Sequence, residues 1–275
     1  MNQDDPIKTA ANTFGLIGQV IKAAGDNPRV KEAANNLAKT AITVTKAINN
    51  VLLPIAAVNF GFDKAREYFE KKFESDMSEK VLTIPPDQIV NPKPSIAGPA
   101  LQGLAFAHEE VNLKEMYLNL LATAMDARVA EKAHPAFVEI IRQLTSDEAN
   151  LIRWILRYDK PTAIVEVRRL TPDFLGSHQL IRHMMPMIDT ATGAPREFPG
   201  FASMVDNWIR LGLVEVDYQR HLMDLDAYAW IDQRPEIKRY LQTEGSERRF
   251  LEYRKGIIQR TSLGLEFAKT VGLLD

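Results

Sequence analysis

Apolar residues recur at helical spacing along the N-terminal part of the chain. They form a first stripe between residues 7 and 21 and a second between residues 30 and 48. A third stripe consists of Phe62, Ala65, Phe69 and Phe73. Spacings of three and four residues place such side chains on one face of a helix. The pattern therefore predicts an N-terminal helical region over residues 1–82.

A proline-rich stretch follows this region. Five prolines lie close together, namely Pro85, Pro86, Pro92, Pro94 and Pro99. Proline lacks the backbone N–H that a helix interior needs, and it favours extended backbone. We therefore expect a linker over residues 83–99, followed by a helical core that runs over residues 100–275.

Two capping-box patterns predict helix starts in the core. Asn112 with Glu115 is one, and Thr145 with Glu148 is the other. In this motif each side chain hydrogen-bonds to the other residue's backbone N–H. The pair His134-Pro135 marks a further helix boundary, because proline is favoured at the first helical position.

In the last part of the chain, short segments in which apolar and polar residues alternate occur among the helical ones. Alternation predicts strands over residues 213–218 and 256–260. The expected helices are 146–157, 172–186, 201–211 and 262–271. Three helices, two strands and a helix follow the order of a winged-helix module. The predicted fold is mainly α, with a winged-helix-like region over 146–275 that contains a small β-hairpin and a long insertion with a helix of its own.

The amino-acid composition excludes several kinds of functional site. The 275 residues include no Cys, which removes disulfides, thiol nucleophiles and thiolate metal sites. The first five residues are polar or acidic apart from Met1, unlike a secretion signal. The best uninterrupted apolar run, residues 51–58, contains Pro54 and is too short to span a bilayer. We expect a cytoplasmic protein without a transmembrane span.

The candidate catalytic and metal-binding residues are few. His134 is either a ligand or base, or a residue whose side chain caps a helix. A metal site of His178, His183 and Asp224 would need tertiary assembly, because no ligand spacing supports it. Asn119 and Asp126 interrupt an apolar helix and indicate either buried hydrogen bonds or a ligand site. Phosphate-loop, zinc-protease and nucleophile-elbow motifs do not occur in the sequence. We expect no catalytic residue, no metal and no cofactor.

A basic segment over residues 234–260 is the best candidate for binding. Its bases outnumber its glutamates although the whole chain has a formal net charge of −2. Aromatic residues alternate with the bases, as in surfaces that bind nucleic acid or acidic peptides. The alternative is a solvated amphipathic helix. The helix at 201–211 carries Arg210 as its only base, which favours a scaffold role over DNA reading. The predicted binding residues are Arg239, Arg248, Arg249, Tyr253, Arg254 and Lys255.

Four segments resemble one known family. They are Pro92–Leu104, Met116–Asp126, His134–Ala149 and Arg260–Phe267, and their order and spacing resemble the abortive infection alpha (Abi-alpha) family from about residue 60 to the end. The resemblance implies a bacterial protein tied to phage resistance. It implies no reaction mechanism and no catalytic residue. Residues 1–59 resemble nothing that we can name.

These observations favour an anti-phage defence protein that acts by binding rather than by catalysis. The expected partner is a second copy of the chain or another protein of a defence system, and nucleic acid is a further candidate. Two alternatives stay open. One is a toxin enzyme, such as a nuclease, whose site the sequence does not reveal. The other is an effector that associates with membranes through its N-terminal helices.

Overall fold

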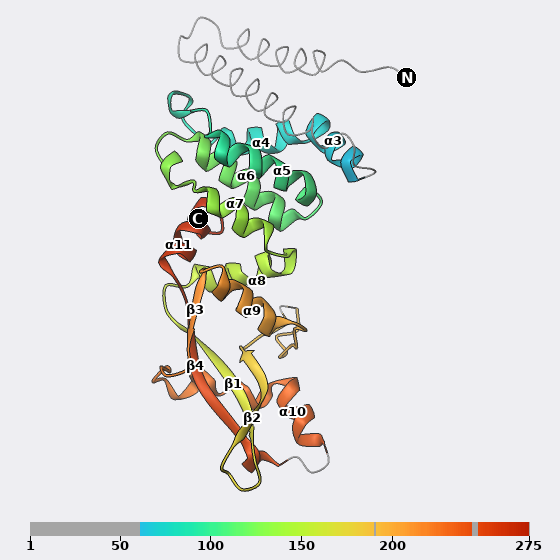
Figure 1. Cartoon of the computed structure of the whole chain (residues 1–275), viewed down its shortest axis with the longest axis vertical. Coiled ribbons are helices and arrows are strands. Elements are labelled where there is room, and N and C mark those ends of the chain that lie inside the picture. The colour runs from blue at the N-terminus through green and yellow to red at the C-terminus, as the bar shows by residue number, and fades with distance from the viewer. Residues whose placement is uncertain (1–60, 190, 244–246, 275) are drawn as a thin grey trace, which may run out of the picture. The chain divides into compact units, whose positions relative to one another are not determined.

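The computed structural model describes residues 61–189, 191–243 and 247–274, which divide into two compact units (Figure 1). The described part of the first unit runs from residue 61 to Ala149 and returns at Lys269–Leu273. The second unit is Asn150–Ala268. The helices expected over residues 7–21 and 30–48 lie outside the described residues. The domain boundary expected at 83–99 stays a prediction.

The first unit is helical. Its elements are α3 (Gly61–Lys71), α4 (Phe73–Val81), η2 (Pro86–Gln88), α5 (Pro94–Ala107), α6 (Val111–Met125), η3 (Ala130–Lys132), α7 (Pro135–Arg142) and the first residues of α8 (Ser146–Arg157). The third apolar stripe is confirmed in part: Ala65, Phe69 and Phe73 are buried, but α3 ends at Lys71 and α4 begins at Phe73, so the stripe is divided between two helices. The side chain of Phe62 lies outside the described residues. Helices α5 and α6 pack together and contribute most of the fully buried side chains of this unit.

The extended linker predicted for 83–99 is wrong for its last six residues, because α5 begins at Pro94. Pro94 stands at the first helical position, where a backbone N–H has no partner to lose. Pro99 lies inside the helix. Gly98 precedes it and has no Cβ to clash with the proline ring, which relieves the usual restriction at this position. Burial of Ile96, Ala100 and Leu101 then offsets the lost hydrogen bond.

Of the two predicted capping boxes, one is confirmed and one is wrong. The Thr145 N–H donates to the Glu148 carboxylate (2.8 Å), and the Glu148 N–H donates to the Thr145 hydroxyl (3.2 Å). Helix α6, in contrast, begins at Val111 with Glu110 as its N-cap. Asn112 is therefore already inside the helix, and its amide donates to the Ser146 carbonyl (3.3 Å) instead.

The second unit is built on a four-stranded antiparallel sheet in the order β2-β1-β4-β3. The two long strands at its centre lie side by side in Figure 1. The elements of this unit, after the rest of α8, are β1 (Thr162–Leu170), β2 (Ser177–Met184), α9 (Phe201–Arg210), β3 (Val214–Asp217), η4 (Leu225–Tyr228), η5 (Ile231–Gln233), α10 (Pro235–Gln242), η6 (Arg248–Phe250), β4 (Leu251–Arg260) and most of α11 (Ser262–Thr270).

The helix predicted over 172–186 is wrong, because β1 and β2 form a hairpin there. Its turn is closed by Thr171, whose hydroxyl accepts from the Gly176 N–H at 2.9 Å. Short apolar runs fit both the helical and the strand period, and pairing with β1 decides in favour of the strand. The two strands intervene between α8 and α9, so the element order differs from that of the expected winged-helix module.

The predicted pairing of the two C-terminal strands is confirmed. Val214 pairs with Arg260 and Asp217 pairs with Ile257. The expected helix between these strands is α10. Overall, the described residues are mostly helical and include one antiparallel sheet. None of their helices combines the length and the apolar character that a membrane crossing needs.

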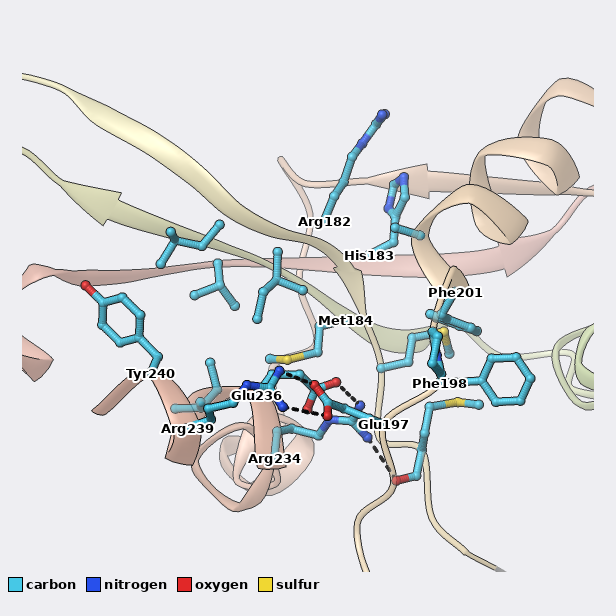
Figure 2. A pocket seen from close by; sticks show the side chains of 18 of the residues that line it. Arg182, His183, Met184, Glu197, Phe198, Phe201, Arg234, Glu236, Arg239 and Tyr240 are labelled. Carbon is cyan, nitrogen blue, oxygen red and sulfur yellow. Dashed lines mark hydrogen bonds and ion pairs between the residues drawn. The ribbon is translucent and has the colours of Figure 1, made fainter. Parts of the chain in front are cut away.

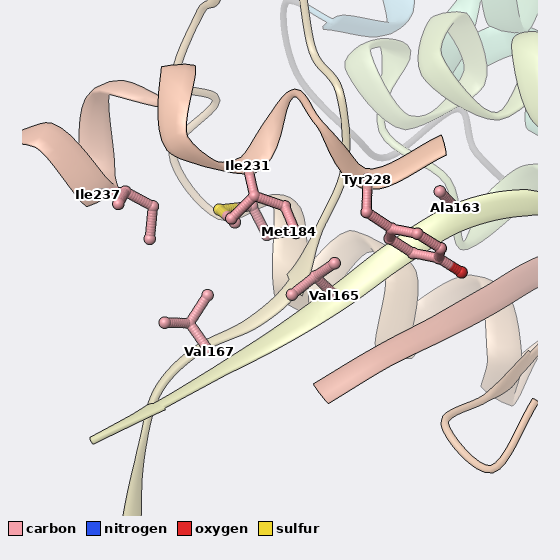
Figure 3. Packing of buried hydrophobic residues seen from close by; sticks show 7 residues of the cluster. All are labelled: Ala163, Val165, Val167, Met184, Tyr228, Ile231 and Ile237. Atoms are coloured by element: carbon pink, nitrogen blue, oxygen red, sulfur yellow. The ribbon is translucent and has the colours of Figure 1, made fainter. Parts of the chain in front are cut away.

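One face of the sheet carries an apolar cluster. Ala163, Val165 and Val167 of β1 are nearly or fully buried. Figure 3 shows Tyr228, Ile231 and Ile237 on the segment that covers these strand residues. The cluster therefore attaches η4, η5 and α10 to the sheet and positions the side chains of the candidate site described below.

A close approach between α5 and α6 offers a test of this packing. A Cβ atom on Gly103 would lie 2.3 Å from the Tyr117 hydroxyl oxygen. We expect Gly103→Ala to lower the free energy of unfolding by about 1–3 kcal/mol, the usual cost of overpacking a core. Gln102→Ala replaces an exposed residue of the same helix and serves as the control. This control should change the free energy by less than about 1 kcal/mol. Urea unfolding followed by circular dichroism measures both, and equal losses would contradict the packing.

Candidate functional site

A cavity of about 740 Å³ opens in the second unit beside β2 and α10 (Figure 2). Strands β1, β2 and β4 give it an apolar floor that includes Val167, Ile181, Met184 and Leu251. The segment before α9 and the start of α9 contribute Phe198 and Phe201, and α10 contributes polar side chains. Its volume lies within the roughly 300–1,000 Å³ that small-molecule sites usually have.

Two arginine–glutamate pairs line this cavity. The Arg239 guanidinium donates to the Glu197 carboxylate at 2.8 Å, and this hydrogen bond lowers the pKa of Glu197. Arg234 donates to the Glu236 carboxylate and also to the backbone carbonyls of Met187 (2.9 Å) and Arg196 (2.8 Å). These bonds tie α10 to the segment that joins β2 to α9.

Arg234 is a buried residue, although its sequence context suggested a surface base. Its exposed fraction is 3%. A buried guanidinium needs nearly all of its donors paired, and three acceptors around Arg234 meet most of that need. Arg234 is therefore a positioning residue of the cavity wall rather than part of an exposed basic surface.

His183, at the end of β2, also lines the cavity and holds a second polar arrangement. It is 1% exposed and has a φ of +56°, which is uncommon for a residue with a side chain. One ring nitrogen, Nδ1, lies 2.9 Å from the Tyr218 hydroxyl, and the other, Nε2, lies 3.2 Å from the Asp206 carboxylate. Since a carboxylate only accepts, Nε2 carries the proton and Nδ1 accepts from Tyr218.

Burial sets the protonation of this arrangement. It lowers the pKa of His183, outweighing the hydrogen bond with Asp206, which raises it. It also raises the pKa of Tyr218 to about 12. A neutral imidazole between a carboxylate and a protonated phenol holds its two neighbours in place. The arrangement therefore connects β2 to α9 and to the residue that follows β3.

The predicted binding residues lie at several places in the second unit. Arg239 lines the cavity. Arg248 pairs with Asp232 at 2.5 Å, and Arg249 pairs with Glu247 at 2.9 Å. Tyr253 is half-buried against the apolar cluster and donates its hydroxyl to Asp232 at 3.1 Å. Burial raises the pKa of Tyr253 to about 12, and the carboxylate of Asp232 adds to that shift.

Arg254 and Lys255 are exposed neighbours on β4 that face opposite sides of the sheet. Arg254 lies opposite Glu166 in the register, and its guanidinium is 5.6 Å from the centre of the Tyr218 ring. Lys255 lies opposite Val165, and its ammonium is 5.0 Å from the centre of the Tyr228 ring. Within the part of the chain that the structure describes, neither base has a carboxylate within 4.0 Å.

A comparison with protein-family models shows to which family the chain belongs. The model described as abortive infection alpha matches residues 65–271, which is well over half of the chain. The chain belongs to the abortive infection alpha family. The matched range includes the cavity and all the predicted binding residues. Searches of the curated proteins and of the solved structures each found no match.

In this member of the abortive infection alpha family, sequence reasoning missed an apolar tip on the β1–β2 hairpin. Phe174 and Leu175 are 56% and 89% exposed. The Phe174 ring stacks on Phe250 at 5.5 Å, and the guanidinium of Arg249 lies 4.9 Å from the centre of the Phe250 ring. The signal in the sequence was Phe-Leu within a turn-forming stretch, Thr171–Gly176, where exposed apolar residues are unusual.

The remaining candidates have structural roles in the abortive infection alpha chain. His134 caps α7, since its ring accepts from the Ala136 N–H at 3.1 Å. Asn119 donates to the Val271 carbonyl (3.2 Å), and Asp126 pairs with Arg128. Among residues 61–189, 191–243 and 247–274, no three His, Asp or Glu side chains group as metal ligands would, so His178, His183 and Asp224 do not come together.

The buried histidine makes stability depend on pH. Histidine in an unfolded chain titrates near about pH 6.5. Because the pKa of His183 is lower in the folded protein, protons bind the unfolded state more readily. Stability is therefore complete above about pH 6.5 and declines as the pH falls from there through the folded pKa.

We expect His183→Asn to flatten that decline, because Asn tolerates a positive φ but does not titrate. The variant should also lose about 1–3 kcal/mol near neutral pH, since Asp206 and Tyr218 lose their partner. Urea unfolding across the pH range measures both effects. His178→Gln replaces an exposed histidine of the same strand and serves as the control. An unchanged decline in His183→Asn would mean that other groups cause it.

Proposed function

We propose that this protein acts in bacterial defence against phages, and that it acts by binding an acidic partner rather than by catalysing a reaction. Membership of a family described by abortive infection supports the defence role. The binding role rests on one observation, which is that the exposed bases of β4 have aromatic rings rather than carboxylates as their neighbours.

Arg254 and Lys255 are the bases best suited to an acidic partner. An exposed cation without a carboxylate beside it keeps its charge available for phosphates or acidic side chains, and gives up no existing ion pair when it binds. Both project from the part of β4 that pairs with β1, Arg254 on one face of the sheet and Lys255 on the other, so the proposed partner has to reach both faces. A rigid strand fixes the spacing of these charges before the partner arrives, which lowers the entropic cost of binding.

Arg248 and Arg249 belong to the same proposed surface with a smaller role. Their ion pairs with Asp232 and Glu247 involve side chains that are about half exposed. Exposed pairs of this kind contribute only about 0–1 kcal/mol and can exchange one acidic partner for another. Arg249 also lies beside the exposed aromatic tip of Phe174 and Phe250, which adds apolar contact area.

Aromatic residues and arginines together suit two kinds of partner. They are enriched at the centres of protein interfaces, and they also stack on the bases of single-stranded nucleic acid. The proposed partner is therefore an acidic protein of the defence system, a second copy of this chain, or nucleic acid, met in the cytoplasm. A toxin enzyme and a membrane effector acting through residues 1–59 are the rival proposals.

Charge reversal on β4 tests the proposal. In cells where the parent protein protects against at least one phage of a panel, we expect the double variant Arg254→Glu with Lys255→Glu to lose protection by at least about ten-fold, because like charges would then face the partner. Plating efficiency measures protection, and circular dichroism checks folding. The control is Lys93→Glu with Lys132→Glu, two exposed bases of the first unit with the same charge change.

Full protection by the folded β4 variant would overturn the proposal. Loss of protection by the control pair alone would assign the working surface to the first unit. Retention of nucleic acid by the purified parent, weakening steeply with salt, would identify nucleic acid as the partner. Loss of protection without any such retention would identify a protein.

A further inference from the structure

Three buried polar atoms around the cavity of the second unit have no hydrogen-bond partner among the residues that the structure describes. They are Nε of Arg234, Oε2 of Glu236 and the hydroxyl oxygen of Tyr240, and all three residues line the cavity. Leaving such groups unpaired away from water is costly. Several of them around one cavity suggest that something in the cavity pairs with them.

The first two atoms form a fixed donor and acceptor. Arg234 donates through Nη1 to Met187 and Arg196 and through Nη2 to Glu236, and among its nitrogen atoms only Nε has no partner in the described part of the chain. Oε1 of Glu236 already accepts from Arg234, which leaves Oε2 free to accept. Figure 2 shows the two side chains together at one wall of the cavity. A molecule that places an acceptor beside a donor would satisfy both atoms without any rearrangement of the wall.

The charges of the wall indicate that this molecule is neutral where it meets the two atoms. Both arginines, Arg234 and Arg239, already have a glutamate partner. A phosphate or carboxylate would have to compete with Glu236 and Glu197 for them. A neutral group needs no exchange of ion pairs, since it uses only the donors and acceptors that remain.

The rest of the cavity requires an apolar body. Val167, Ile181, Met184 and Leu251 form its floor, and Phe198 and Phe201 stand at its side. A sugar or another polyol would leave its hydroxyls unpaired against these side chains. A flat ring would instead cover them with its faces while its edge met Arg234 and Glu236.

We propose that this cavity binds a neutral, planar heterocycle with a hydrogen-bond acceptor next to a donor, which is the chemistry of a nucleobase. The site differs from the β4 surface described above, and it goes beyond the proposed defence function. Tyr240 contributes a further donor, because a protonated phenol can give its hydrogen to a ring nitrogen or carbonyl.

The test uses the full-length protein and the four ribonucleosides adenosine, guanosine, cytidine and uridine as probes. Isothermal titration calorimetry should show that at least one of them binds saturably, with one molecule per chain. Glu236→Gln keeps the oxygen that accepts from Arg234 and turns the free acceptor into a donor. We expect this variant to weaken binding at least about ten-fold, since two donors would then face each other.

Tyr240→Phe separates a binding role from a structural one. Removing an unpaired buried hydroxyl should leave the thermal midpoint unchanged or raise it. The same change should weaken nucleoside binding by about three- to ten-fold. Glu247→Gln removes an exposed carboxylate that does not line the cavity, and it should bind like the parent.

Absence of saturable binding by all four nucleosides would overturn the inference and mean that water pairs with the three atoms. A folded Glu236→Gln variant that binds as tightly as the parent would overturn it too. If Glu236→Gln fails to fold, Tyr240→Phe decides, and unchanged binding in that variant counts against the site. Because binding is measured on pure protein without phage, its failure is distinct from failure of the defence proposal.

Discussion

The second unit depends on the pairing of β1 with β4. Eight residue pairs, from Thr162 with Ile258 to Arg169 with Leu251, join two segments that are more than 80 residues apart in the chain. The central residues of β1, Ile164, Val165 and Val167, have no exposed surface. Because burial specifies the register, a slip by one residue would turn Val165 and Val167 away from the apolar cluster. Strands β2 and β3 take their places only as neighbours of this central pair.

The same register separates the two faces of the sheet. One face carries Val165, Val167 and Tyr253 toward the apolar cluster, and this cluster positions α10 and with it Arg234, Glu236 and Arg239 of the cavity wall. The other face carries Ile164 together with polar residues. Glu166 is 6% exposed there, pairs with Arg168 at 2.7 Å and lies opposite Arg254.

A glycine, Gly256, allows the Tyr218 ring to pack directly against β4. A Cβ atom on Gly256 would lie 2.6 Å from the Tyr218 ring. Without one, Tyr218 packs against the strand, where its hydroxyl reaches His183 and its ring lies near Arg254. The proposed binding surface and the buried histidine therefore share one aromatic neighbour.

The sequence predicted the features that depend on nearby residues. Thr145 and Glu148 are three residues apart, and each hydrogen-bonds to the other's backbone N–H at the start of α8. Such signals are complete within one turn of helix. The alternating segment Val214–Asp217 was equally plain, and its partner strand was identified correctly.

What the sequence did not predict depends on residues far apart in the chain. Segment Ser177–Met184 has apolar spacings that fit a helix, and only pairing with β1 makes it a strand. Arg234 looked like one base among several in a basic segment, whereas the structure buries it against carbonyls 38 and 47 residues away. The cavity joins β2, the start of α9 and α10, so no local pattern could reveal it.

The central claim is that the β4 surface of the second unit contacts the partner during infection. Photo-crosslinking in infected cells tests it most directly. A photo-reactive amino acid replaces Glu252, an exposed residue of β4, or Gln102, an exposed residue of α5 in the first unit. The account predicts a crosslinked species that forms at position 252 after infection and is absent at position 102. Crosslinks that form at position 102 alone, or at neither position in cells that are protected, would contradict it.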